Sequence, residues 1–406
     1  MRQSADFVAR RRRDKKNVIL LTGGTGFLGS HMAVELLRRG HFVILLCRPK
    51  NGLSGARRMR QLFEWSDFPA GDNFRVIEGQ ITQPRFGLDE ETYAYLKDNT
   101  DEILHCVAET AFSEAKRSQL EAINVEGTRH ALQLAAESRC YFFHHISTAY
   151  VAGQQHGLCQ EQYVPQARFH NAYEQTKHAA EGLVLETCQA EGIRANIYRP
   201  SIVYGDSRSG KSLLFNAFYA PMKLAHYLQT IWERDFAENE GHHAASMGVT
   251  RDDDGVMHAS IRIERAETGV VNLIPIDFLT RACLAIMEDS LDGDIFHLVN
   301  DRGDALDELL VYMRRVINID GIRLVSPGHL EAEPRTALEK LVAGYMDVYQ
   351  PYFYDDRIFD VTKAQAILAR HNITCPQIDY AVFSRCIRYA IEVNWGKQLF
   401  SEQQPE

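Results

Sequence analysis

The sequence lacks any pair of cysteines at the spacing of a metal or redox motif. Its eight cysteines are scattered along the chain, and no two of them form a Cys-x-x-Cys pair. Scattered single cysteines do not make a zinc site, and they are typical of proteins from a reducing compartment. We therefore expect no bound metal and a cytoplasmic location.

A hydrophobic run long enough to cross a membrane is also missing. The apolar stretch at residues 213–232 is interrupted by Asn216, Pro221, Lys223 and His226. Such a segment is too polar to span a bilayer, so we expect no transmembrane segment.

The first sixteen residues contain no apolar segment of the kind that a secretory signal needs. They carry arginines at positions 10–13 and lysines at positions 15 and 16. We expect residues 1–16 to form a disordered, solvated basic tail. A docking site for an acidic partner is the alternative interpretation.

An excess of basic residues is absent as well. Lys and Arg number 45 against 54 Asp and Glu, which gives a net charge of −9 and argues against nucleic acid as a partner. The chain has 406 residues, more than a usual single domain. We therefore expect one large domain with a smaller lobe, and the sequence does not indicate the oligomeric state.

The stretch around which the chain is organised lies at residues 18–30, Val-Ile-Leu-Leu-Thr-Gly-Gly-Thr-Gly-Phe-Leu-Gly-Ser. Its apolar start, without alternation, is typical of a strand covered on both faces in a parallel sheet. Gly23, Gly26 and Gly29 then suit a tight turn, close approach of a pyrophosphate, and close packing of a helix on the strand. A second strand at residues 42–47 completes a βαβ unit that predicts a dinucleotide site.

The end of the second strand favours NADPH over NADH. Enzymes that use NAD usually carry an acidic residue there, which binds the ribose 2′-hydroxyl. This chain reads Cys47-Arg48-Pro49-Lys50 instead, and a cation at Arg48 suits a 2′-phosphate. A solvated charge at the strand end is the alternative for Arg48.

Strands and helices alternate through the first half of the chain. Further strands are predicted at residues 74–78, 102–107, 141–147 and 196–198, with helices at 90–99, 119–139 and 172–190. This rhythm predicts an α/β fold with a doubly wound parallel Rossmann sheet, whose ligands bind at the carboxyl ends of the strands.

The predicted division follows from where that rhythm stops. We expect the dinucleotide-binding domain at residues 17–205, with a late return of the chain to it near 270–300. Residues 206–269 and 301–406 would form a smaller, mainly helical substrate-binding lobe, with a polar, mobile loop at 238–255.

A phenol and an ammonium lie four residues apart in Tyr173-Glu-Gln-Thr-Lys177, on one face of a predicted helix. Lys177 can hydrogen-bond the nicotinamide ribose while its charge depresses the pKa of the phenol, so that Tyr173 passes a proton near neutral pH. Thr148 follows Ser147 at the end of a predicted strand, 25 residues before Tyr173. Its hydroxyl would hold the substrate oxygen.

Together these segments resemble the extended short-chain dehydrogenase/reductase superfamily over about residues 17–300. The marks are Thr22-Gly-Gly-Thr-Gly-Phe-Leu-Gly29, His105-Cys-Val-Ala108, Asn124-Val-Glu-Gly-Thr128, Ser147-Thr148, Tyr173-x-x-x-Lys177 and Arg199-Pro-Ser-Ile-Val-Tyr-Gly205. The resemblance implies a catalytic triad of Thr148, Tyr173 and Lys177, with Asn124 as a helper through a water. It also implies a cofactor site made of Thr22, Gly23, Thr25, Gly26, Phe27, Leu28, Gly29, Arg48, Gln80, Ile81, Ala108, Lys177, Pro200 and Val203.

Within that superfamily the chain resembles the thioester reductase and fatty acyl-CoA reductase branch, also called male-sterility-like. The marks are Gly205-Asp-Ser-Arg-Ser-Gly210, Asn272-Leu-Ile-Pro-Ile-Asp277 and Gly79-Gln-Ile-Thr-Gln-Pro84. The branch usually has Asp where Gln80 stands. It often follows a carrier domain in a larger synthetase; no carrier or adenylation segment is evident here, and we expect a free-standing enzyme.

This branch implies NADPH-dependent reduction of an acyl thioester, held on CoA or on an acidic carrier protein, to an aldehyde and then to an alcohol. Residues 213–222 would form part of an acyl pocket or plain lobe core. The alternatives are a sugar-nucleotide epimerase or dehydratase with tightly bound NAD, a ketone or aldehyde reductase of the same fold, and a non-catalytic binding module.

Two further patterns do not predict sites. Residues 205–212 match the Walker A pattern of phosphate-binding loops, but the loop after Arg199-Pro200 already explains them. Lys211 could instead meet a pantetheine phosphate. Glu238, Glu240, His242 and His243 lie in a hydrophilic stretch without the spacing of metal ligands.

Overall fold

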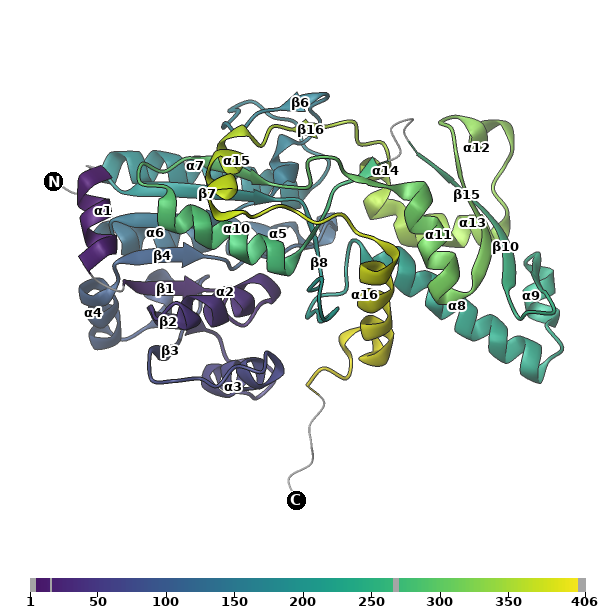
Figure 1. The fold of residues 1–406 in the computed structure, drawn as a ribbon, viewed down its shortest axis with the longest axis horizontal. Helices are drawn as coiled ribbons and strands as arrows, with labels where there is room; N and C mark the ends of the chain where they lie inside the picture. Colours follow the sequence, from purple (N-terminus) through teal and green to yellow (C-terminus); the bar gives the residue numbers. More distant parts are fainter. Residues whose placement is uncertain (1–4, 15–16, 266–269, 401–406) are drawn as a thin grey trace, which may run out of the picture. The chain divides into compact units, whose positions relative to one another are not determined.

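The computed structural model describes residues 5–14, 17–265 and 270–400, and its chain divides into two compact units (Figure 1). The first comprises Met1–Ser201, Ile276–Val299 and Ile358–Cys375, and the second comprises Ile202–Pro275, Asn300–Arg357 and Pro376–Glu406. Ile358–Cys375 was predicted in the smaller lobe, and that prediction is wrong. This segment pairs with and packs on elements of the first unit.

The first unit is built on a seven-stranded sheet in the order β13-β7-β5-β4-β1-β2-β3, and all its neighbouring strands are parallel. The strands are β1 (Val18–Thr22), β2 (Phe42–Cys47), β3 (Phe74–Glu78), β4 (Glu102–His105), β5 (Phe142–Ile146), β7 (Arg194–Pro200) and β13 (Ile295–Leu298). Central strands are buried over nearly their whole length, as expected for a sheet covered on both faces. The predicted doubly wound Rossmann fold is confirmed.

Helices cover both faces of this sheet. One layer contains α2 (Phe27–Arg38), α10 (Ile276–Asp289) and α15 (Thr362–Leu368), and the other contains α4 (Glu90–Asn99), α6 (Gly127–Glu137) and α7 (Ala172–Glu191). Helix α3 (Gly55–Trp65) follows β2, and the short strands β6 (Leu158–Cys159) and β16 (Ile358–Phe359) pair with each other. The carboxyl ends of β1, β4, β5 and β7 therefore share one edge, where ligands of such sheets bind.

Residues 5–14 form a helix, α1 (Ala5–Asp14), so the prediction of a disordered tail is wrong for this part of the chain. Arg12 donates two hydrogen bonds to the carboxylate of Glu102, at 3.1 and 3.2 Å, and Arg11 pairs with Asp101. Arg11 and Arg12, two of the arginines that suggested a solvated tail, therefore attach this helix to Asp101 and Glu102, where β4 begins.

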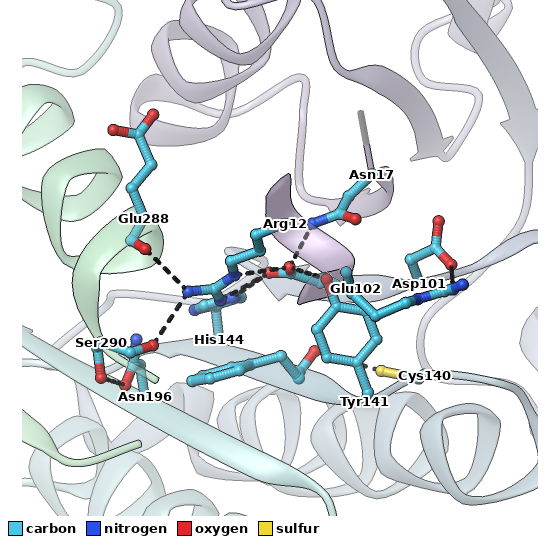
Figure 2. A network of polar contacts seen from close by, with 12 residues as sticks. Arg12, Asn17, Asp101, Glu102, Cys140, Tyr141, His144, Asn196, Glu288 and Ser290 are labelled. Atoms are coloured by element: carbon cyan, nitrogen blue, oxygen red, sulfur yellow. Dashed lines mark hydrogen bonds and ion pairs between the residues drawn. The ribbon is translucent and has the colours of Figure 1, made fainter. Parts of the chain in front are cut away.

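Glu102 is 2 % exposed and accepts from four side chains (Figure 2). Besides Arg12, the donors are Asn17 Nδ2 at 2.7 Å, the Tyr141 hydroxyl at 2.6 Å and His144 Nε2 at 2.8 Å. Burial pushes the pKa of Glu102 upward, but Arg12 and His144 together hold that pKa well below its usual range. The network lies at the amino ends of the strands, so it stabilises the edge opposite the cofactor edge.

The second unit combines helices with small sheets. Its longer elements are α8 (Tyr219–Glu238), β10 (Met257–Glu264), α11 (Leu306–Ile317), β15 (Ile319–Val325), α13 (Ala337–Met346) and α16 (Tyr380–Glu392). Shorter ones are β8 (Ile202–Tyr204), α9 (His242–Ser246), β9 (Val249–Arg251), β11 (Val270–Val271), β12 (Leu273–Pro275), β14 (Asp304–Ala305), α12 (His329–Ala332) and α14 (Gln350–Phe353). The three-stranded sheet β15-β10-β9 was not anticipated.

A polar, mobile loop was predicted at residues 238–255. That prediction is wrong for part of this stretch, because it contains α9 and β9. Asp235 explains part of this order, since its carboxylate accepts from the backbone N–H of Ala244 at 2.9 Å. Among the described residues, no helix has both the length and the apolar character that crossing a membrane requires.

Candidate active site

The turn between β1 and α2 admits only glycine at two positions. A Cβ at Gly29 would lie 2.1 Å from the carbonyl oxygen of Gly23, and one at Gly23 would lie 2.7 Å from the backbone nitrogen of Val107. Gly23 also has a φ of +73°, which L side chains rarely adopt. Helix α2 begins directly after Gly26, so its first N–H groups and its dipole face the space beside the turn. The turn fits the diphosphate of a dinucleotide.

Other predicted cofactor residues surround this turn. Thr25, Phe27 and Leu28 are partly exposed, whereas Thr22 is buried and its hydroxyl lies 2.9 Å from His105 Nδ1. Thr22 therefore acts within the protein rather than at a free surface.

The end of β2 presents more than one cation. Arg48 is exposed, and Arg58 Nη1 donates to the carbonyl oxygen of Arg48 at 2.8 Å. The nearest strand-end carboxylate, Glu78, already accepts from the backbone nitrogen of Gly55 at 2.7 Å. Arg58 thus holds a second guanidinium beside Arg48. It was not among the cofactor residues predicted from the sequence, because its spacing of ten residues from Arg48 matches no motif.

The remaining predicted cofactor residues lie on several segments. Gln80 is exposed and its backbone N–H donates to Phe86 at 2.8 Å, while the carbonyl of Ile81 accepts from His130 at 2.8 Å. Pro200 ends β7, and its carbonyl lies 3.4 Å from Thr148 Oγ1. Val203 belongs to β8 of the second unit, where it pairs with Ile274. The cofactor roles of these residues stay predictions.

Tyr173 and Lys177 lie one turn apart near the start of α7, which Asn171 caps by accepting from the N–H of Glu174. Thr148 follows the end of β5 by two residues, and Lys177 Nζ donates to the carbonyl oxygen of Ile146, the last residue of that strand, at 2.6 Å. The structure therefore packs the helix that carries Tyr173 and Lys177 against the strand end that precedes Thr148. The roles of these three residues stay predictions.

One expectation about Tyr173 is wrong. Burial raises the pKa of Tyr173 to about 12; the side chain of Thr148 opposes this shift, and Glu174 adds to it. Lys177 does not depress that pKa, because its Nζ is directed at the carbonyl oxygen of Ile146, 2.6 Å away. A phenol with a raised pKa stays protonated at neutral pH and is suited to donate a proton.

Asn124 joins two parts of the candidate site. It lies in the π-helix η3 (Glu121–Glu126), which together with α5 (Arg117–Leu120) and α6 replaces the single helix predicted at residues 119–139. Its side chain accepts from the backbone N–H of Glu109 at 2.9 Å and donates to Glu109 O at 3.0 Å and to Thr176 Oγ1 at 3.1 Å. Asn124 thereby connects the loop that contains Ala108 to the helix that carries Tyr173 and Lys177. Its role as a helper through a water stays a prediction.

The sequence reasoning missed three aromatic neighbours of the triad. The ring of Phe112 lies 5.6 Å from that of Tyr173. His145 Nε2 lies 3.4 Å from Lys177 Nζ, and the ring of His105 stacks on that of His145 at 5.7 Å. The sequence places His144 and His145 in one predicted strand, where at least one of them was expected to be core or sheet packing. No local pattern indicated that His145 meets Lys177.

The Walker-like loop does not present its amides to a ligand. The backbone N–H groups of Arg208 and Ser209 donate to the Asp206 carboxylate at 3.0 and 2.7 Å, and that of Gly210 donates to Asp206 O at 2.8 Å. The next helix, α8, begins only at Tyr219. A phosphate-binding loop needs these amides unpaired at a helix start, so this is not one.

Two other patterns from the sequence can be located in the structure. Phe218, Tyr219 and Met222 of the apolar stretch lie in the hydrophobic core of the second unit. Within residues 5–14, 17–265 and 270–400, no group of three or more His, Cys, Asp or Glu side chains is arranged to hold a metal ion.

Known proteins share these features. A family model described as male sterility protein matches residues 21–283. Fatty acyl-CoA reductase 1 of Mus musculus is 32% identical over 193 residues, which is 44% of this chain and 37% of that protein. The chain spans between 4% and 37% of the length of the first curated relatives that it matches.

Solved structures share the fold over nearly the whole chain. The terminal R domain from the myxalamid PKS-NRPS biosynthetic pathway has a TM-score of 0.72 at 24% identity, covering 94% of this chain and 92% of that one. UDP-glucuronic acid 4-epimerase from Bacillus cereus, in complex with NAD, has a TM-score of 0.61 at 16% identity, covering 95% and 100%. At these identities the likeness defines the fold alone.

The seven-stranded parallel sheet and its glycine turn define a protein of the dinucleotide-binding Rossmann class. Since the family model covers more than half of the residues, the chain belongs to the male sterility protein family of that class.

Proposed function

We propose that this protein is an NADPH-dependent reductase of acyl thioesters. The observation that carries the proposal is the 2.6 Å hydrogen bond from the buried ammonium of Lys177, one helical turn from Tyr173, to the carbonyl oxygen of Ile146, two residues before Thr148. A carbonyl oxygen placed between two hydroxyl groups gains two hydrogen bonds as it becomes an oxyanion.

The residues of the chain divide the chemistry between them. NADPH supplies a hydride to the thioester carbonyl carbon. Thr148 holds the carbonyl oxygen, and Tyr173 transfers its phenolic proton to that oxygen as the negative charge forms. The hemithioacetal then breaks its carbon–sulfur bond while the proton on its oxygen passes to the departing sulfur, which yields aldehyde and thiol. Solvent returns to Tyr173 the proton that it gave. A second hydride transfer to the aldehyde would give the alcohol.

Lys177 supports this chemistry as a cation. It is 2 % exposed, and burial lowers its pKa to about 8, against the opposing effects of Glu181 and Cys106. At neutral pH most of the population is therefore charged, and the ammonium can donate to the ribose hydroxyls of the nicotinamide half.

Arg48 and Arg58 support the choice of NADPH. Two guanidinium groups beside the strand end suit a 2′-phosphate, which carries negative charge and several acceptor oxygens. The free cysteines of the chain remain consistent with the predicted cytoplasmic location.

The substrate class is supported by the family and by relatives named as a fatty acyl-CoA reductase and as the R domain of a biosynthetic synthetase. We infer a thioester on CoA or on an acidic carrier protein. The test is to monitor NADPH oxidation with acyl-CoA, carrier-bound acyl, aldehyde and sugar-nucleotide substrates, and to identify the products. Oxidation with a thioester and release of its thiol would support the proposal.

A sugar-nucleotide epimerase is the second candidate, because a UDP-glucuronic acid 4-epimerase has the same fold. Such an enzyme would retain NAD through purification and convert a sugar nucleotide without net NADPH oxidation. That outcome would replace the reductase proposal.

A further inference from the structure

The buried surroundings of Lys177 contain a second contact besides Ile146. His145 Nε2, on β5, lies 3.4 Å from Lys177 Nζ, and both side chains are at most 2 % exposed. An ammonium has only donors, so His145 Nε2 must accept when Lys177 is charged. The imidazole is then neutral, with its proton on Nδ1.

That tautomer carries a cost in this structure. His145 Nδ1 is buried, and no described residue offers it a hydrogen-bond partner. An unpaired buried N–H is unfavourable. A leucine or phenylalanine at this position of the apolar strand would avoid that cost. What the histidine offers and those residues lack is the lone pair on Nε2, which can accept a hydrogen bond.

The neighbouring histidine keeps His145 neutral and in place. Thr128 Oγ1 donates its one proton to the carbonyl oxygen of Asn124 at 2.6 Å, so it can only accept from His105 Nε2, at 3.2 Å. His105 Nδ1 is then free to accept from Thr22 Oγ1 at 2.9 Å. The neutral ring so fixed stacks on His145, with an angle of 15° between the planes.

We propose that His145 is a positioning residue of the reductase site, which accepts a hydrogen bond from Lys177 and so keeps that lysine charged and aimed at the cofactor. The inference rests on the proposed function. The contacts of Thr22 with His105, of His105 with His145 and of His145 with Lys177 connect the end of β1, just before the glycine turn, to the ammonium on α7.

The titratable groups that face Lys177 come from three elements. Tyr173 and Glu181 lie on α7 itself, His105 and Cys106 lie at the end of β4, and His145 lies on β5. Glu181 is held by Arg199 in a buried ion pair with bonds of 2.6 and 2.9 Å. Both histidines have a pKa below the ordinary value because of burial and of Lys177. His145 is therefore the neutral acceptor that faces the ammonium of Lys177.

The test is the pH dependence of NADPH affinity, measured by cofactor fluorescence between about pH 6 and pH 10, a range that brackets the titration of a buried lysine. His145→Phe keeps an aromatic ring against His105 but removes the acceptor. We expect the midpoint at which affinity falls to move down by about one pH unit. His145→Gln, whose amide oxygen can accept, should bring the midpoint most of the way back to the wild-type value. His178→Phe is the matched control, because His178 lies next to Lys177 in sequence but bonds Val164 O at 2.8 Å; it should leave the midpoint unchanged.

The steady-state rate gives the second measurement. The alkaline limb of kcat should shift in His145→Phe by the same amount as the binding midpoint, while KM for the thioester stays unchanged at low pH. A folded His145→Phe protein with an unshifted midpoint, or equal loss at every pH without rescue by His145→Gln, would overturn the inference. If His145→Phe does not fold, His145→Leu takes its place with the same expected shift.

The two proposals fail in different ways. A chain that binds NADPH with the expected shift but reduces no thioester would refute the proposed function and leave the role of His145 in cofactor binding supported. A chain that reduces thioesters with a binding midpoint insensitive to His145 would refute only this inference.

Discussion

The ammonium of Lys177 lies 2.6 Å from the carbonyl oxygen of Ile146, so the lysine on α7 is fastened to the end of β5 two residues before Thr148. This contact sets the direction of Nζ and explains why Lys177 does not depress the pKa of Tyr173. It also keeps the buried ammonium beside the candidate active site, so we expect the loss of its proton to set the pH dependence of activity.

The first prediction concerns pH. Burial lowers the pKa of Lys177 from 10.5 to about 8, so the charged form dominates below pH 8 and disappears as the pH rises. If the ammonium is required, kcat falls as the pH passes about 8. A pH profile of the wild type would show this limb. Lys177→Met should be slow at every pH and lack it; a wild-type rate that keeps rising to pH 10 would contradict the requirement for the charge.

The second prediction concerns the proton donor. Tyr173→Phe removes the phenolic proton that the proposed mechanism transfers, so turnover should fall at least about a hundredfold. NADPH affinity should change less than about threefold, since the ring remains. Stopped-flow and fluorescence titration measure the two effects. Tyr95→Phe, on α4, is the matched control and should leave both unchanged, whereas unchanged turnover in Tyr173→Phe would remove the phenol from the mechanism.

The third prediction concerns cofactor choice. Arg48→Asp should weaken NADPH binding by about ten- to a hundredfold, as expected for losing a charge-assisted hydrogen bond to a phosphate. NADH, which has no 2′-phosphate, should lose far less. Arg58→Met should show the same selective loss to a smaller extent, because its guanidinium also holds the Arg48 backbone. Arg60→Asp makes the same charge change at an exposed position of α3 and should affect both cofactors alike. Equal losses of NADPH and NADH in Arg48→Asp would rule out a 2′-phosphate contact.

The fourth prediction concerns stability. Arg12→Met leaves the buried carboxylate of Glu102 without its cation, and the free energy of unfolding should fall by about 3–5 kcal/mol. Arg10→Met, on the exposed side of α1, is the control and should change it by less than about 0.5 kcal/mol. Chemical denaturation measures both. A loss in Arg12→Met no larger than that in Arg10→Met would show that α1 is not held by this pair.

The carboxylate of Glu102 also makes the free energy of unfolding depend on pH. The pKa of Glu102 is lower in the folded chain than in the unfolded one. Its contribution is therefore complete above the unfolded value of about 4.5 and is lost as the pH falls below it. Glu102→Gln should be less stable at neutral pH but should lose less further stability between about pH 5 and pH 3 than the wild type.

The sequence predicted the sheet because its signals were local. Unbroken apolar runs such as residues 42–47 and the three glycines after Thr22 each determine structure within a few residues. Tyr173, Lys177 and Thr148 were found because a fixed spacing on a helix and a strand end bring them to one edge.

The features that the sequence did not predict depend on contacts between distant segments. Arg12 looked like part of a solvated tail because Glu102, its partner, is 90 residues away. His145 looked like core because its contact with Lys177 crosses from a strand to a helix. The pKa of Tyr173 depends on burial, and the direction of Nζ depends on the backbone of Ile146; neither can be read from the spacing of two residues.

The most direct test uses NADPH deuterated at C4 of the nicotinamide, an acyl thioester and the wild-type chain, with products identified by mass spectrometry. The account predicts one deuterium on the former carbonyl carbon of the aldehyde, one free thiol for each NADPH oxidised in that step, and neither product from Tyr173→Phe. NADPH consumed without deuterium in the product, or full activity in Tyr173→Phe, would contradict it.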